Sequence, residues 1–156
     1  MNVLFLDYDG VVNTPMWNEE GTHCCFGFPE DQKVNNFQCV QWVSEFCEKY
    51  DFSIVVTSSW RLTTSLYREC LYNGGLRRNI KIVGCTAFGD GSDREFEIAT
   101  YLKMHNEIDK YLIFDDYEDF DCLKDHLVQC ETDVGFNILR FKEAEELYNK
   151  LYRKRN

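Results

Sequence analysis

The chain has 156 residues, a length that suits a single domain with a substantial buried core. Its hydrophobic content of 44% excludes a disordered chain. Its formal net charge of −10 argues against nonspecific binding to nucleic acid or anionic membranes, since both need a basic face.

The first predicted element is a strand that ends in two carboxylates. Residues 3–6 form an unbroken apolar run, typical of a strand buried on both faces, and Asp7, Asp9 and Gly10 follow it. Side chains two apart on an extended chain point the same way, so Asp7 and Asp9 would converge at one sheet edge. Like charges this close require a cation or a shared proton. The alternative is an aspartate-rich turn after an edge strand.

Residues 11–33 predict an irregular, flap-like insertion. They hold both prolines and several aromatic residues, which favours a packed or substrate-facing flap. Helical spacing of apolar residues follows over 34–50, and a β-branched strand at 52–57 ends in Ser58 and Ser59.

The second half alternates strands and helices. A helix from about residue 62 ends at the Asn73-Gly74-Gly75 stop, and a strand follows at 80–85. Asp93 or Ser92 caps a helix over 94–105, and a strand at 111–114 ends in two aspartates. Residues 127–130 predict a fifth strand, with a helix over 119–130 as its rival, and a helix at about 140–153 closes the chain.

This alternation predicts an α/β fold. We expect a Rossmann-like three-layer sandwich with a central, mainly parallel five-stranded sheet and right-handed crossovers, forming a single domain over 1–156. The carboxyl ends of parallel strands lie at one edge.

The cysteines favour a reducing compartment. Eight are present without a C-x-x-C pair, and there are only three histidines, so a zinc site is not expected. The sequence shows no signal peptide and no membrane-length apolar run, so we expect a cytoplasmic protein with reduced thiols.

Polar residues gather at the predicted strand ends. They are Asp7 and Asp9, then Thr57, Ser58 and Ser59, then Asp115 and Asp116. Oxygen ligands of this kind favour Mg²⁺. Such a site suits phosphoryl transfer, with one carboxylate attacking phosphorus and another moving the proton.

These motifs, in this order, resemble the haloacid dehalogenase-like superfamily of aspartate-nucleophile phosphatases. The D-x-D-G, the V-V-T-S-S-W-R segment, the R-x-x-E-I and the I-F-D-D are similar to a small capless branch that includes domains attached to bacterial RNA-repair proteins.

The resemblance implies a role for each motif. Asp7 would be the nucleophile, and Asp9 the general acid/base with its backbone carbonyl on Mg²⁺. Ser58 would hold the phosphate, with Thr57 as its rival. Asp115 and Asp116 would complete the metal site.

The third motif of the superfamily usually carries a lysine, which this chain does not match. Arg94 takes that role here, with Lys103 and Lys81 as alternatives, because an arginine can clamp a phosphate with two hydrogen bonds. Gly10, Ser59 and Arg61 are further candidate substrate contacts, although Arg61 could instead pair with an aspartate.

The short insertions imply an open site that admits large substrates. We therefore expect a phosphorylated macromolecule as partner, with a phosphoprotein, and phosphotyrosine in particular, favoured. The alternative is a nucleic-acid or nucleotide 3′- or 5′-phosphatase, which the negative charge disfavours. A catalytically silent phosphate- or partner-binding domain is the third reading.

Overall fold

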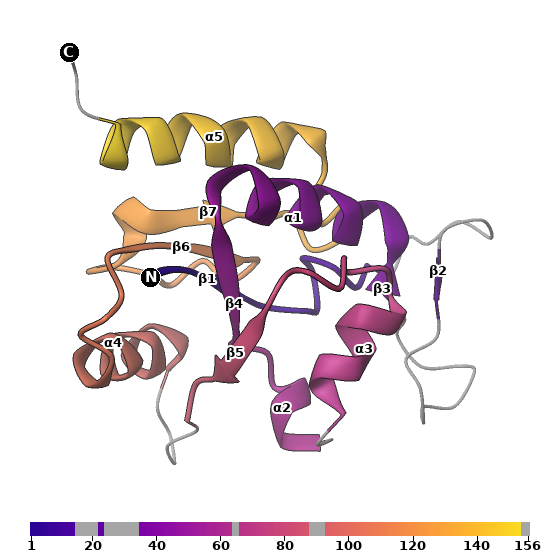
Figure 1. The fold of residues 1–156 in the computed structure, drawn as a ribbon, viewed down its shortest axis with the longest axis horizontal. Helices are drawn as coiled ribbons and strands as arrows, with labels where there is room; N and C mark the ends of the chain where they lie inside the picture. The colour runs from indigo at the N-terminus through magenta and orange to yellow at the C-terminus, as the bar shows by residue number, and fades with distance from the viewer. Residues whose placement is uncertain (15–21, 24–34, 64–65, 88–92, 154–156) are drawn as a thin grey trace.

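A five-stranded parallel sheet forms the centre of the protein (Figure 1). The computed structural model describes residues 1–14, 22–23, 35–63, 66–87 and 93–153. The strand order is β5-β4-β1-β6-β7, and all four neighbouring pairs are parallel. The strands are β1 (Asn2–Leu6), β4 (Phe52–Val56), β5 (Ile82–Cys85), β6 (Lys110–Asp115) and β7 (Leu127–Gln129). The predicted parallel sheet is confirmed.

Helices cover both faces of this sheet (Figure 1). Helices α1 (Phe37–Tyr50) and α5 (Ile138–Tyr152) pack side by side on one face, and α4 (Arg94–Met104) covers the other. The strands supply alternate residues to the two faces: Leu4 and Leu6 pack in the core beneath α1, whereas Val3 and Phe5 pack toward α4. The result is the predicted three-layer α/β sandwich.

Two elements differ from the expected pattern. The helix predicted from residue 62 is divided into α2 (Trp60–Thr63) and α3 (Tyr67–Asn73). The rival helix over 119–130 is wrong, because this segment contains only a short 3-10 turn, η1 (Lys124–His126), directly before β7.

Two helix boundaries follow the predicted signals. Helix α3 ends at Asn73, where the backbone N–H groups of Gly74 and Gly75 donate to carbonyls of the last turn. Asp93, one of two predicted caps, accepts a hydrogen bond from the backbone N–H of Phe96 and so fixes the start of α4.

The carboxyl edge of the sheet carries no large cap domain in the described part of the chain. Residues 11–14 form a buried turn directly after β1. Beyond these residues, the described part of the predicted flap is β2 (Thr22–His23), which pairs antiparallel with β3 (Asn35–Asn36). Residues 15–21 and 24–33 of the flap lie outside the described residues. The extent of the single domain stays a prediction.

Six cysteines fall in described segments, and all are free thiols. Four of them are buried, as expected of small hydrophobic side chains. Cys24 and Cys25 lie outside the described residues. No helix in the described segments combines the length and apolar character that crossing a membrane requires.

Candidate active site

The site lies where the strand order reverses. From β1 the chain crosses to β4 on one side, and later to β6 on the other, so the carboxyl ends of β1 and β6 flank the switch point at which open α/β sheets bind ligands. Leu6 pairs with Phe114, which places Asp7 beside Asp115. The backbone N–H of Asp7 donates to the carbonyl of Phe114 at 3.1 Å and fixes this register.

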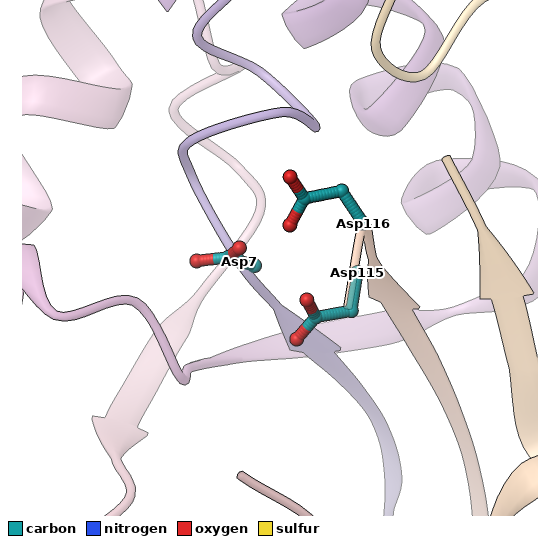
Figure 2. Close-up of side chains that lie close together, drawn as sticks. All are labelled: Asp7, Asp115 and Asp116. Carbon is teal, nitrogen blue, oxygen red and sulfur yellow. The ribbon is translucent and has the colours of Figure 1, made fainter. Parts of the chain in front are cut away.

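Three carboxylates converge at this point (Figure 2). Asp7 follows β1, whereas Asp115 and Asp116 come from the end of β6 and turn toward it. One oxygen of each lies within 4.8 Å of the others. Asp7 and Asp115 are buried, and Asp116 is half-buried. A set of oxygen donors this close fits Mg²⁺.

Gly10 makes room for one of these carboxylates. Its φ is +79°, and an added Cβ would lie 2.2 Å from Oδ2 of Asp116. The same Oδ2 accepts a hydrogen bond from the Thr132 hydroxyl at 2.9 Å. The D-x-D-G motif therefore needs a glycine at this position because a side chain would collide with Asp116. The predicted contact of Gly10 with substrate stays a prediction.

Arg94 is the basic residue that the structure brings to the carboxylates. Its Nη1 lies 2.7 Å from Oδ2 of Asp115 and 3.1 Å from Oδ1 of Asp7. As the first residue of α4, its position is fixed by the Asp93 cap. The alternatives lie elsewhere: Lys81 directly precedes β5, at the opposite end of the strands, and Lys103 is in the last turn of α4.

Charge in this cluster is unbalanced. Burial, reinforced by the Asp115 carboxylate, raises the pKa of the Asp7 carboxyl to about 8, although the Arg94 guanidinium acts in the opposite direction. Burial raises the pKa of Asp115 as well. Ionisation of all three carboxylates beside one guanidinium would leave an excess of negative charge, which a divalent cation would neutralise.

Asp9 does not join the three carboxylates. Its Oδ1 accepts a hydrogen bond from Nδ2 of Asn13, and its Oδ2 accepts one from Nε1 of Trp60, both at 3.2 Å. The side chain is half-buried. Its carboxyl group is thus held apart from the three clustered carboxylates. This position is compatible with the separate acid/base role that the resemblance implies.

The hydroxyl residues after β4 lie beside the nucleophile candidate. The backbone N–H of Thr57 donates to the carbonyl of Leu6, which places Thr57 next to Asp7. Its hydroxyl is buried and has no hydrogen-bond partner among the residues that the structure describes. Ser58 is also buried, and its Oγ accepts from the backbone N–H of Trp60 at 3.3 Å. Both remain candidates for the phosphate contact, while Ser59 is exposed at the start of α2.

Arg61 pairs with a carboxylate, which is the alternative that the sequence left open for it, although the partner is a glutamate. Its side chain is only 3% exposed, and Nη2 lies 2.7 Å from Oε2 of the buried Glu97. The remaining nitrogens donate to the backbone carbonyls of Thr57, Ser58 and Thr86. The contacts of this enclosed guanidinium favour a structural role, and its contact with a substrate stays a prediction.

Sequence reasoning missed the partners that hold the site residues. Trp60, Asn13 and Thr132 are not among the predicted site residues. The position of Trp60 directly after the hydroxyl motif was the available signal, whereas nothing in the sequence distinguishes Thr132.

A profile for the family described as "HAD domain in Swiss Army Knife RNA repair proteins" matches residues 3–138. The match includes every candidate residue of the site. No curated protein and no solved structure matches the chain.

Proposed function

The chain belongs to the family of HAD domains found in Swiss Army Knife RNA repair proteins, and from this premise we propose that it is a Mg²⁺-dependent phosphatase with Asp7 as its nucleophile. One observation carries the proposal: Arg94 bridges Asp7 and Asp115 beside a third carboxylate. This arrangement offers a nucleophile, a cation for the phosphate and a site for a metal within one small volume.

The reaction proceeds in two halves. A carboxylate oxygen of Asp7 attacks phosphorus, the bond to the leaving oxygen breaks, and that oxygen takes a proton from Asp9. This leaves an aspartyl-phosphate on Asp7. In the second half the Asp9 carboxylate accepts a proton from water, the water oxygen attacks phosphorus, and the bond to Asp7 breaks to release inorganic phosphate.

Other groups of the site stabilise the phosphate. The Arg94 guanidinium contributes positive charge, and the hydroxyl of Ser58 or Thr57 donates to a phosphate oxygen. Asp7, Asp115 and Asp116 would hold the Mg²⁺ ion, which supplies positive charge against the phosphate when bound.

For the substrate, the family description favours a phosphorylated RNA end. We rank phosphorylated RNA ends first as the substrate class, and phosphotyrosine proteins, which the sequence alone favours, second. Acidic residues line the hollow beside Asp116, which disfavours extended contact with a polyanion on that side. They are Glu118, Glu131, Asp133 and Glu143. A substrate bound mainly through its terminal phosphate would avoid this repulsion.

The first experiment tests the chemistry. Wild-type protein with Mg²⁺ should release phosphate from p-nitrophenyl phosphate, and Asp7→Asn should lower kcat by about 10⁴-fold or more because the nucleophile is lost. Asp51→Asn, an exposed position in the turn before β4, is the matched control and should retain activity. Wild-type protein without turnover on any phosphomonoester would favour the silent binding domain.

The second experiment tests the substrate class. Oligoribonucleotides with a 3′- or 5′-phosphate are compared with phosphotyrosine and phosphoserine peptides at equal concentration. A higher kcat/KM for the oligoribonucleotides supports the RNA end. Faster turnover of the phosphotyrosine peptides would reverse the order of the two candidates.

A further inference from the structure

Trp60 connects the two motifs that the proposed reaction must coordinate. Its backbone N–H donates to Oγ of Ser58, and its indole Nε1 donates to Oδ2 of Asp9. Ser58 belongs to the phosphate-binding segment after β4, whereas Asp9 belongs to the segment after β1. One residue therefore contacts both a candidate phosphate contact, through its backbone, and the proposed general acid/base, through its side chain.

The indole is itself firmly held. Trp60 is 9% exposed, and its ring centroid lies 6.1 Å from that of Tyr8, which is fully buried. The Tyr8 hydroxyl donates to the backbone carbonyl of Tyr67 at 2.5 Å. The donor that reaches Asp9 is thus fixed by packing on both α2 and α3, and it does not depend on a mobile surface side chain.

The chemistry of the indole suits a positioning role. An indole N–H donates a hydrogen bond but cannot accept a proton. It can therefore orient Oδ2 of Asp9 without competing for the proton that Asp9 must transfer. Asn13 fixes the other oxygen, and its own backbone N–H donates to the Tyr8 carbonyl at 2.8 Å within the turn after β1.

We propose that Trp60 is a positioning residue that orients the Asp9 carboxyl group toward the leaving oxygen of the substrate. This inference rests on the proposed phosphatase function. Proton transfer to a leaving group requires the carboxyl within hydrogen-bond reach, and a small displacement lowers the rate. Loss of the indole donor should therefore weaken acid catalysis while leaving nucleophilic attack by Asp7 in place.

The test uses substrates that need the acid to different degrees. The leaving group of p-nitrophenyl phosphate departs without a proton, phenyl phosphate needs more assistance, and the alkyl oxygen of β-glycerol phosphate needs the most. The measured quantity is kcat/KM, because it covers the steps up to the first phosphoryl transfer and leaves out hydrolysis of the aspartyl-phosphate.

Trp60→Phe should lower kcat/KM for β-glycerol phosphate by about 10-fold or more, and for p-nitrophenyl phosphate by less than about 3-fold. Asp9→Asn should show the same selectivity with a larger loss. Trp42→Phe, a substitution on α1 where the indole packs against Phe141, is the matched control and should change neither value.

Two further measurements separate positioning from folding. Replacing Trp60 by 3-benzothienylalanine keeps the shape of the ring and removes only the N–H donor, so it should reproduce the selectivity of Trp60→Phe. Thermal unfolding shows whether each variant is folded. A folded variant with equal losses on all substrates, or with no loss, would overturn the inference. Wild-type protein without turnover would instead overturn the proposed function and this inference with it.

Discussion

Two arginines form ion pairs at the carboxyl edge of the sheet, and they serve different purposes. Arg94, in the first turn of α4, contacts Asp7 and Asp115 and keeps 22% of its side chain exposed. Arg61, the second residue of α2, contacts Glu97 in the first turn of α4 and is 3% exposed. Both arginines join α4 to the carboxyl edge of the sheet.

The partners explain the difference. Arg61 donates to the backbone carbonyls of Thr57, Ser58 and Thr86 as well as to Glu97, so its donors connect the ends of β4 and β5 to α4. Arg94 faces two carboxylates of the proposed active site, where a bound phosphate and a metal ion would interact with the same charged groups. An arginine enclosed by carbonyl groups stabilises the fold. An arginine beside a cluster of carboxylates with excess negative charge can bind a ligand.

The largest expected effect comes from removing Arg61. Arg61→Met removes the ion pair between Arg61 and the buried Glu97 carboxylate and should lower the free energy of unfolding by about 3–5 kcal/mol. Chemical denaturation measures this, and the double variant Arg61→Met/Glu97→Met should lose less than Arg61→Met alone. If Arg61→Met instead keeps its stability and loses activity, Arg61 contacts the substrate after all.

Removing Arg94 should affect catalysis more than folding. We expect Arg94→Met to lower kcat/KM by about 10²–10³-fold, because the site loses its positive charge against the phosphate. Assays and thermal unfolding are both run with Mg²⁺, which balances the negative charge of the carboxylates that lose Arg94. Lys103→Met, an exposed substitution at the other end of α4, is the control and should match wild type. If Arg94→Met and Lys103→Met were equally active, Arg94 would not belong to the active site.

The last prediction concerns pH. The pKa of Asp7 is raised from its ordinary value of 3.8 to about 8 by burial and by Asp115, so the folded protein binds a proton that the unfolded chain releases in this range. Metal-free stability should therefore fall as pH rises from 4 to 8, by at most about 1.4 kcal/mol per pH unit for this group. Because Mg²⁺ favours the ionised carboxyl, its stabilising effect should grow over the same range.

Thermal unfolding from pH 5 to 9, with and without Mg²⁺, measures this dependence. Asp7→Asn carries no titratable group at this position, so in this variant the difference in stability with and without Mg²⁺ should depend less on pH. An increase of the Mg²⁺ effect toward acid pH would contradict the assignment of Asp7 to the metal cluster.

The amino-acid pattern was enough to predict the sheet and where most of the site residues lie. Unbroken apolar runs predicted the strands, and because parallel strands end at one edge, Asp7 and the Asp115-Asp116 pair could be placed together from spacing alone. Arg94 was predicted from the resemblance to the superfamily, which usually has a lysine before the last motif. The strands and the residues at their ends depend on local pattern and chain order, which the sequence contains directly.

The different environments of Arg61 and Arg94, and the contact of Trp60 with Asp9, could not be predicted from the sequence. Each of these depends on how helices pack against the strand ends: the Arg61 partner Glu97 is 36 residues away, and the Trp60 partner Asp9 is 51 residues away. A side chain's type and sequence neighbours do not reveal whether it is enclosed by carbonyl groups or left open beside a charge. That is decided by the packing of distant segments, which places a buried donor beside its acceptor.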